Sequence, residues 1–305
     1  MSSKDDNMSG GDDDLILSQP ETKKELLHGQ SFAFGGMQGW RKSNEDFHRH
    51  LVPIDNHHWK LWSYFAIFDG HNGTDTAKNA ANLLDKHLID ALNGISKGKS
   101  SDDLIHSSQF DLYQLTQIVK HTFLQLDKEL VSLVRDQSGS VCIATLIGPE
   151  HIYLINLGDS RAIIISKDGK VLEYTKDHKP NVRKEKERIL KAGGHVTQML
   201  GDVARVEDQL AVSRALGDYS IDKHLIPASP DIIQFERNSK STANFLILAC
   251  DGVWDVMSNE QVASFVIQRI SNTSLENIAS QLLDHCLHLQ TMDNTSVYII
   301  QLDEK

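Results

Sequence analysis

Residues 141–174 contain four short apolar runs separated by turn signals, and this pattern constrains the fold more than any other part of the chain. The runs are VCIATLI, HIYLINL, RAIIIS and VLEY, and the turns between them include Gly148-Pro149 and Lys167-Asp168-Gly169-Lys170. Short strands joined by tight turns usually pair antiparallel with their neighbours along the chain. The segment therefore predicts an antiparallel meander and argues against a strict alternation of strands and helices.

Other apolar runs and helical periods fall in separate blocks on either side of this segment. Strands are predicted at 32–36, 62–68, 245–250 and 296–302, and helices at about 74–88, 112–134, 180–191, 258 onward and 275–289. Such blocks indicate an α+β fold with two antiparallel β-sheets packed as a sandwich and antiparallel helices on the outer faces. Two packed sheets should leave a cleft along one end.

The length and composition fit one domain with a tail. With 305 residues, of which 40% are hydrophobic, the chain can bury one sizeable core. Residues 1–28 combine an acidic Gly/Ser segment with LILSQPETKKELL, an apolar patch too short to form its own core. We expect 1–28 to be a mostly disordered acidic tail, with ordered structure from about Ser31, and 29–302 to be a single folded domain.

The net charge of −11 argues against a nucleic-acid or anionic-membrane partner, because both surfaces would repel the chain. No apolar stretch approaches the length of a membrane span, and the first residues lack the pattern of a signal peptide or a myristoylation site. The three cysteines, Cys142, Cys250 and Cys286, lie in apolar stretches and fit a reducing compartment. We therefore expect an intracellular protein, in the cytoplasm and/or the nucleus, with a monomer as the default state.

Four aspartates stand at the ends of strongly apolar strands. Asp69 follows YFAIF, Asp159 follows IYLINLG, Asp251 follows LILAC, and Asp293 precedes SVYII. A carboxylate near a core is costly unless it is paired, hydrogen-bonded or bound to a metal. No neighbouring stretch supplies lysines for all four, so a metal site is indicated.

The donor types favour a hard cation. All four groups are oxygen donors, and no Cys/His pair has the spacing of a zinc site, so Mg²⁺ or Mn²⁺ is preferred. Two such ions can polarise a phosphate and acidify a water molecule between them. Asp-Gly is also a common turn, and Asp168-Gly169 fits that simpler interpretation. Taken singly, Arg41 is typical of a surface residue and His71 of a loop histidine, and Glu45 and Asp46 are compatible with a capped turn.

Six ordered motifs together resemble the metal-dependent type 2C family of protein serine/threonine phosphatases. They are GMQGWRKSNED (36–46), FAIFDGHNG (65–73), INLGDSRA (155–162), LAVSRALGD (210–218), ACDGVWDV (249–256) and DNTSV (293–297). The resemblance covers about residues 31–302. It implies hydrolysis of phosphoserine and phosphothreonine in protein substrates by direct attack of metal-bound water or hydroxide, with two Mg²⁺ or Mn²⁺ ions per site.

The resemblance also implies roles for individual residues. Asp69 would bridge the two ions, with the carbonyl of Gly70 on one ion and Asp251 and Asp293 on the other. Glu45 and Asp46 would hold metal-bound waters, and Asp159 with Asp255 would form a candidate third metal site. Arg41 would bind the substrate phosphate through its planar fork, and His71 would protonate the leaving oxygen.

The chain also departs from the family pattern. Gly139-Ser140-Val141-Cys142 stands where a Gly-Ser-Thr-Ala stretch is common, 198–207 differs from the family pattern, and 218–230, expected to form a flap beside the cleft, is short. Two alternatives remain open. One is a catalytically inactive pseudophosphatase scaffold, and the other is a phosphohydrolase acting on small metabolites.

Overall fold

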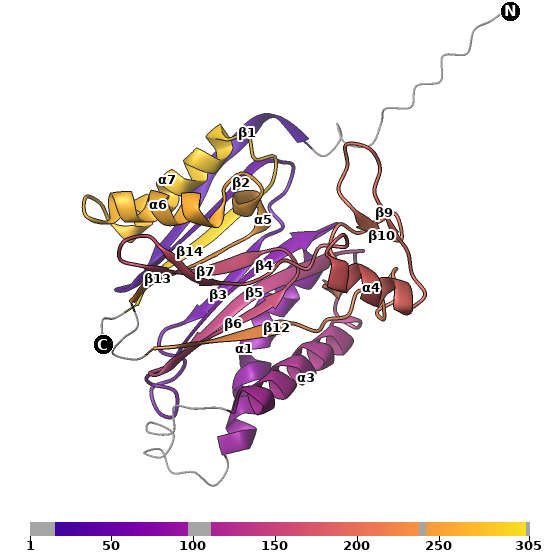
Figure 1. Ribbon diagram of the computed structural model, residues 1–305, viewed down its shortest axis with the longest axis horizontal. Coiled ribbons are helices and arrows are strands. Elements are labelled where there is room, and N and C mark those ends of the chain that lie inside the picture. Colours follow the sequence, from indigo (N-terminus) through magenta and orange to yellow (C-terminus); the bar gives the residue numbers. More distant parts are fainter. Residues whose placement is uncertain (1–15, 97–110, 238–241, 303–305) are drawn as a thin grey trace, which may run out of the picture.

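The computed structural model describes residues 16–96, 111–237 and 242–302. Two six-stranded antiparallel sheets stack face to face, and helices cover both outer faces (Figure 1). Sheet I has the order β1 (Ile16–His28), β2 (Phe32–Arg41), β14 (Thr295–Gln301), β13 (Ala243–Ala249), β7 (Arg161–Ser166) and β8 (Val171–Tyr174). Sheet II has the order β12 (Asp231–Glu236), β6 (His151–Leu157), β5 (Gly139–Ile147), β4 (Ser63–His71) and β3 (Phe47–Leu51), with β11 (Leu216–Gly217) paired to β5. The predicted α+β sandwich is confirmed.

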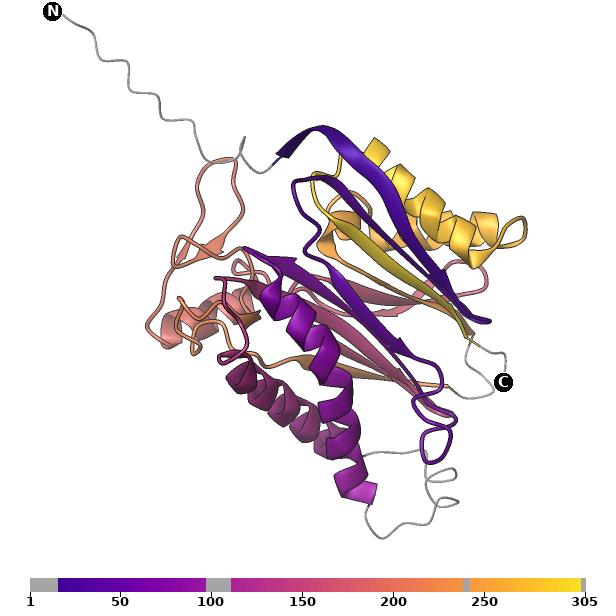
Figure 2. The same cartoon turned by 180° about the vertical axis from the view of Figure 1, so that it is seen from behind.

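The helices divide between the two sheets. On sheet II lie α1 (Asp75–Ser96) and α3 (Leu112–Leu130), which run beside one another in Figure 2. On sheet I lie α5 (Asp251–Trp254), α6 (Asn259–Ile270) and α7 (Leu275–His288). A capping box of Ser258 and Gln261 starts α6, which agrees with the helix predicted from 258 onward. A separate lobe holds α4 (Arg183–Lys191) and the short hairpin of β9 (Val196–Thr197) and β10 (Arg205–Val206).

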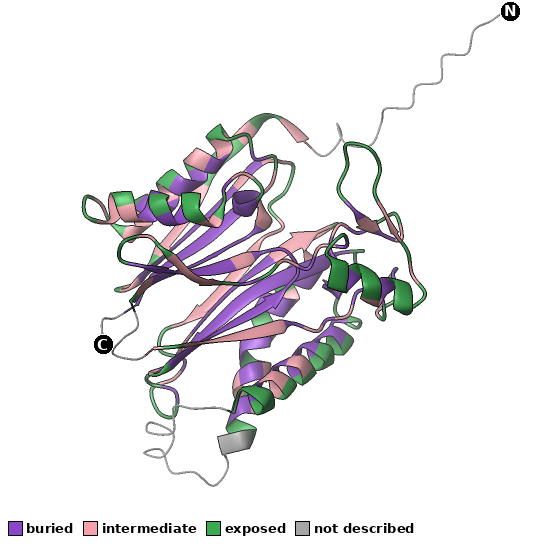
Figure 3. Cartoon of the chain, viewed as in Figure 1, coloured by how far each residue is buried: buried purple, intermediate pink, exposed green. Residues whose placement is uncertain are grey.

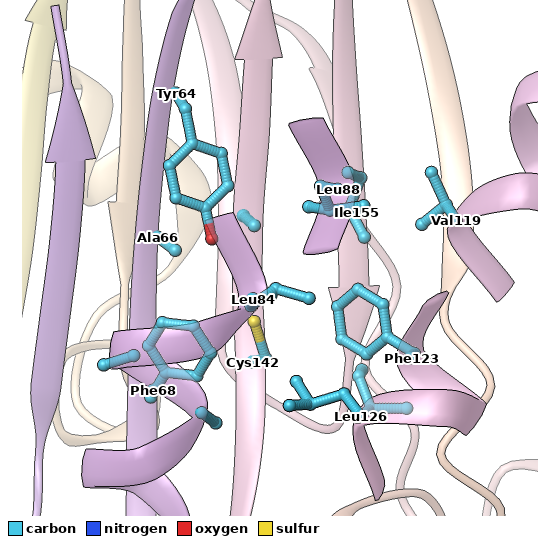
Figure 4. Close-up of a cluster of buried hydrophobic side chains, with 14 of the residues drawn as sticks. Tyr64, Ala66, Phe68, Leu84, Leu88, Val119, Phe123, Leu126, Cys142 and Ile155 are labelled. Atoms are coloured by element: carbon cyan, nitrogen blue, oxygen red, sulfur yellow. The ribbon is translucent and has the colours of Figure 1, made fainter. Parts of the chain in front are cut away.

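The apolar faces of these layers form the core. The central strands of both sheets are buried along most of their length, whereas the helices are buried on one face (Figure 3). Figure 4 shows the cluster under sheet II, where Phe68 of β4 and Cys142 of β5 lie close to Leu84 of α1 and Phe123 of α3. All three cysteines are buried and unpaired, as their apolar surroundings predict. In the part of the chain that is described, no helix has the length and apolarity to span a bilayer.

The predicted four-strand meander is in fact two hairpins in different sheets. The strand bounds of β6, β7 and β8 agree with the apolar runs, but β5 and β6 belong to sheet II whereas β7 and β8 belong to sheet I. The chain crosses between the sheets at Gly158, whose φ of +105° favours glycine and whose Cβ, if present, would lie 2.1 Å from Val141. This crossing places Asp159 between the two sheets.

The structure also differs from the prediction at the N-terminal side. Residues 16–28 form β1 at the edge of sheet I, so they are not part of a disordered tail. The segment needs no core of its own, since β2 supplies its backbone partners and Leu27 packs against the core between the sheets. Lys24 adds an ion pair of 2.6 Å to Asp284 of α7. Residues 1–15 lie outside the described residues.

Candidate active site

The four aspartates singled out in the sequence line one pocket at the end of the sandwich. Asp69 lies near the end of β4 and Asp159 follows β6, both in sheet II, whereas Asp251 follows β13 and Asp293 precedes β14 of sheet I. The pocket has a volume of about 560 Å³, and Arg41 also lines it. Side chains more than 200 residues apart therefore meet because the corresponding strand ends lie at the same edge.

Three of these carboxylates are close enough to share a cation. Asp69, Asp159 and Asp251 each offer an oxygen, and these atoms lie within 4.8 Å of one another. A second group of the same spacing joins Asp69 to Asp46 and to the Cys250 sulfur. Oxygen-rich clusters of this kind suit hard divalent cations.

The pKa values of these groups reflect burial and mutual repulsion. Burial raises the pKa of Asp69 well above its usual value, and the charges of Asp46, Asp293 and Asp159 raise it further. Burial and the charge of Asp69 do the same for Asp251. A bound cation would relieve this repulsion and stabilise the ionised carboxylates.

Asp46 provides a separate indication that a cation fits here. Its Oδ2 is buried and has no hydrogen-bond partner among the described residues, which is costly for a carboxylate oxygen. Burial, together with the charges of Asp293 and Glu45, raises its pKa to about 7. The Cys250 thiol is kept protonated by burial, which raises its pKa well above the usual value, so the oxygens are the available ligands.

Glu45 and Gly70 pack against each other at the edge of this cluster. A Cβ on Gly70 would lie 2.4 Å from the Glu45 carbonyl oxygen, so the close approach of the two backbones requires glycine. Glu45 accepts hydrogen bonds from the Ser43 hydroxyl at 3.1 Å and the Gly73 amide at 3.3 Å, and its own amide donates to Asn294. Gly70 is among the residues that line the pocket, whereas Glu45 and Asp46 are not.

Arg41 lies at the mouth of the pocket and is paired with Asp293. Its Nη2 is 2.6 Å from Asp293 Oδ2, and its Nε donates to the Met292 carbonyl at 3.2 Å. The Arg41 side chain is 42% exposed, so it remains accessible to an anion that enters the pocket. The expected phosphate-binding arginine therefore lies beside the expected metal ligands.

His71 also lines the pocket and is held by Asp218, a residue that the sequence analysis did not assign. Its Nε2 lies 2.9 Å from both carboxylate oxygens of Asp218, which is 4% exposed. Burial alone would lower the pKa of His71, but the hydrogen bond and charge of Asp218 outweigh it and raise the pKa. Gly139 is required here, because a Cβ would lie 2.0 Å from Asp218 and 2.3 Å from His71.

Asp159 and Asp255 are both paired with Lys179, a second residue that the sequence analysis did not assign. The Lys179 Nζ lies 3.6 Å from Asp159 Oδ2 and 3.4 Å from Asp255 Oδ1. Burial raises the pKa of Asp159 to about 6, although Lys179 opposes that shift. The two carboxylates expected at a third metal site thus lie on either side of an ammonium group.

The segment beside the pocket is not the one that the sequence predicts. Gln198, 202–205 and 209–212 line the pocket, so the β9–β10 hairpin and the turn after it form its rim. Residues 218–230 do not line it. Instead, Ile221, Leu225 and Ile226 pack in the small core beneath α4. The family resemblance did not reveal which of the two segments lies beside the pocket, because neither segment has a strong apolar period that predicts its place in the fold.

The chain is similar in sequence to a known family. The sequence model of the family described as "Protein phosphatase 2C" matches residues 30–295. "Protein phosphatase 1B" of Bos taurus is 37% identical over 303 residues, which cover 93% of this chain and 60% of that protein. The chain thus spans less than two thirds of that relative.

Solved structures show the same fold. The "crystal structure of a phosphatase from a pathogenic strain Toxoplasma gondii" has a TM-score of 0.73 and 26% identity, covering 92% of this chain and 95% of that one. The "serine-threonine phosphatase 2C from Toxoplasma gondii" has a TM-score of 0.76 and 22% identity, covering 95% and 99%.

Proposed function

Because the chain belongs to the protein phosphatase 2C family, we propose that it hydrolyses phosphoserine and phosphothreonine in protein substrates with the help of Mg²⁺ or Mn²⁺. The observation that carries the proposal is the convergence of Asp69, Asp159, Asp251 and Asp293 on the pocket that also holds Arg41. The proposed catalytic domain includes β1, so it comprises 16–302 rather than the expected 29–302, and it acts as a monomer.

The carboxylates are the proposed cation ligands. Asp69, the Gly70 carbonyl, Asp251 and Asp293 would hold the two ions, with Asp69 serving both, and Glu45 and Asp46 would hold water molecules beside them. Asp159 and Asp255 are the proposed ligands of a third ion. When bound, the ions supply the positive charge that polarises a phosphate and acidifies water. The unpaired buried Oδ2 of Asp46 supports this assignment.

Arg41 is the proposed phosphate-binding residue. Its guanidinium can offer two parallel N–H groups to phosphate oxygens, a geometry that lysine cannot reproduce. The ion pair with Asp293 holds the guanidinium at the pocket mouth before substrate arrives. Positioning of this kind lowers the entropic cost of binding the phosphate in a reactive orientation.

His71 is the proposed general acid. A serine or threonine alkoxide is a strongly basic leaving group, and a proton delivered to its oxygen makes departure easier. Asp218 engages Nε2 of His71 and favours the protonated ring, so Nδ1 is the nitrogen left to donate the proton. The proposed reaction is direct hydrolysis with no phosphorylated side chain, and the buried, protonated Cys250 is poorly suited to be a nucleophile.

A scaffold without turnover is the alternative function. Such a protein is expected to lack a metal carboxylate or the phosphate-binding arginine, whereas here Arg41 and the four strand-end aspartates share one pocket. This arrangement favours catalysis.

Three buried cysteines without a disulfide support a reducing compartment such as the cytoplasm or nucleus.

Phosphate release from a phosphothreonine peptide tests the proposal. We expect release with millimolar Mn²⁺ or Mg²⁺, none with excess EDTA, and none from an Asp69→Asn variant that keeps the far-UV circular dichroism spectrum of the parent. A folded protein that releases no phosphate in either metal would favour the scaffold. Faster hydrolysis of small phosphorylated metabolites than of phosphopeptides would favour a metabolite phosphohydrolase.

A further inference from the structure

The ammonium group of Lys223 contacts the stretch of backbone that leads into Asp218. Its Nζ donates to the carbonyls of Ala215 and Gly217, each at 2.9 Å, and lies 3.3 Å from Oδ2 of Asp127 on α3. Three acceptors match the three N–H groups of a lysine ammonium. The Lys223 side chain is 28% exposed, so most of it is shielded from solvent. Lys223 therefore joins the backbone before Asp218 to α3.

Asp127 ties the same stretch of backbone to α3 through further hydrogen bonds. Its Oδ1 accepts the Gly217 amide at 2.9 Å, while its Oδ2 faces the Lys223 ammonium. Its backbone carbonyl accepts the Tyr219 hydroxyl at 2.7 Å. Asp127 is buried, and a buried carboxylate is costly unless it is paired and hydrogen-bonded. The residues on both sides of Asp218 are thus held by one aspartate and its lysine partner.

The turn at Asp218 has a backbone conformation that needs such support. Gly217 has a φ of +74° and Asp218 a φ of +51°, so two successive residues lie in the left-handed region. This conformation costs free energy for an aspartate and persists where the surrounding structure holds it. The Asp218 amide also donates to the Ser138 carbonyl at 3.1 Å. The result is a turn that directs the Asp218 carboxylate at His71 Nε2, 2.9 Å away.

Lys223 and Asp127 act on the pocket only from a distance. Neither of them is among the residues that line it, whereas His71 is. Burial lowers the pKa of Lys223, and the negative charges of Asp127 and Asp218 oppose that shift, so the ammonium and the Asp218 carboxylate are close enough to interact. Any effect of the lysine on the reaction must therefore pass through Asp218 to His71.

We propose that Lys223 is a positioning residue for the general acid, an assignment that rests on the proposed function. Together with Asp127 it holds the left-handed turn, and the turn holds the Asp218 carboxylate against His71. Without the ammonium, two carbonyls lose their donor and Asp127 loses its counter-ion, so the turn can relax toward ordinary backbone angles. His71 is then less well oriented to deliver a proton to the leaving oxygen, whereas the cluster of strand-end aspartates and Arg41 stay in place.

Steady-state kinetics of the full chain in Mn²⁺ test this role with Lys223→Met, which keeps the length of the side chain and removes its charge and donors. We expect kcat for a phosphothreonine peptide to fall about tenfold with KM unchanged, a part of the roughly 10²-fold or more that general acid catalysis supplies. The kcat for p-nitrophenyl phosphate should fall much less, because its aryl oxide leaves without a proton. The rise in Tm on addition of Mn²⁺ should match that of the parent, since no proposed metal ligand is changed.

Lys128→Met is the matched control, because Lys128 is exposed on α3 directly beside Asp127. Its kinetics on both substrates should match those of the parent. Asp127→Asn is a second test variant that removes the ion pair with little change of shape, and it should show the same selective loss as Lys223→Met. If Lys223→Met does not fold, Asp127→Asn decides the outcome.

A double variant shows whether the lysine acts through the histidine. His71→Ala/Lys223→Met should have the same kcat as His71→Ala on each substrate, because the effects of residues that act through one another are not additive. Equal losses on the two substrates, an unchanged kcat for the peptide, or a further loss in the His71→Ala background would overturn the positioning role and leave the proposed function standing. A folded parent protein that releases no phosphate in Mn²⁺ would overturn both.

Discussion

His71 Nε2 lies 2.9 Å from each carboxylate oxygen of Asp218, a residue 147 positions later in the chain. β11, which immediately precedes Asp218, pairs with the start of β5, and Gly139 leaves the space that the pair occupies. The structure therefore uses a two-residue strand to bring an orienting carboxylate to a pocket histidine. A histidine whose orientation is fixed by a carboxylate recurs in many active sites.

The loss of activity caused by removing His71 or Asp218 should depend on how basic the leaving group of the substrate is. We expect His71→Ala and Asp218→Asn to reduce the hydrolysis of a phosphothreonine peptide about 10²-fold or more and to reduce that of p-nitrophenyl phosphate much less, because an aryl oxide departs without a proton. Steady-state kinetics on both substrates would measure this. Asp222→Asn, a change of an exposed carboxylate nearby, is the control. Equal losses on the two substrates would contradict the acid role of His71.

Asp69→Asn should change stability in opposite directions with and without metal. In EDTA the substitution relieves repulsion among buried carboxylates, so we expect the Tm to rise by a few degrees, about 2–4 °C for each kcal/mol in a domain of this size. In Mn²⁺ the metal-induced rise in Tm should disappear, because binding to the native state is lost. Differential scanning fluorimetry measures both.

The exposed aspartate Asp90 on α1 provides the matched control for that experiment. Asp90→Asn should keep the metal-induced rise of the parent and show no rise of Tm in EDTA. An Asp69→Asn protein that is still stabilised by Mn²⁺ to the same extent would contradict the bridging role.

Arg41→Ala should lower kcat/KM about 10- to 100-fold, because hydrogen bonds to charged groups contribute about 1.5–3 kcal/mol and 1.4 kcal/mol corresponds to a factor of ten. Arg41→Lys should have a kcat/KM between those of the parent and Arg41→Ala, since lysine keeps the charge but not the planar fork. Arg183→Ala serves as the control, because Arg183 is 92% exposed and pairs with Glu187 on the surface of α4. Unchanged kinetics for Arg41→Ala would exclude phosphate binding by Arg41.

Ionised Glu185 should contribute to the free energy of unfolding, and this contribution should be lost at acid pH. It is 3% exposed and accepts hydrogen bonds from Arg214 at 2.5 Å and 3.0 Å. Burial alone would raise its pKa, but Arg214 and Arg188 outweigh burial and lower it from 4.5 to about 2. A lowered native pKa stabilises the fold above pH 4.5, and this contribution, about 3 kcal/mol, is lost as the pH falls toward 2.

Glu185→Gln should therefore unfold at lower urea concentration at pH 7 and show a flatter pH dependence of the free energy of unfolding between pH 4.5 and 2. Glu187→Gln is the matched control two residues away, because the Glu187 side chain is 64% exposed. Its free energy of unfolding should stay within about 0.5 kcal/mol of the parent, as is usual for an exposed ion pair. Equal effects of the two substitutions would contradict a special role for the buried pair.

Sequence alone predicts the strand-end aspartates because their signal is local. An apolar run that stops at a carboxylate, as at Asp69 and Asp251, can be recognised without knowing what lies across the fold. Asp218 and Lys179 have no such signal, since each acquires its partner only when distant segments pack together. Asp218 lies in a motif that can be recognised in the sequence, but its hydrogen bond to His71 forms only in the folded protein. The ion pair between Lys179 and Asp159 likewise forms only in the folded protein.

The strands show the same division between local and distant information. The apolar runs give the bounds of β6, β7 and β8 correctly, yet periodicity does not reveal that the chain changes sheets at Gly158. β1 escapes prediction because an edge strand covers little apolar surface and can be mostly polar. β1 is held in place by backbone hydrogen bonds to β2, and amino-acid composition does not reveal such bonds.

The register of β1 bears on how the protein should be handled. Ile16 lies directly across from Arg41, so a purification tag or fusion partner joined directly before residue 16 would be tethered beside a residue that lines the pocket. Gln301 ends β14 at the opposite end from Asp293, roughly 20 Å along the strand. Attachment after residue 302 therefore leaves the entrance clear, and kinetic comparisons are best made with proteins labelled there.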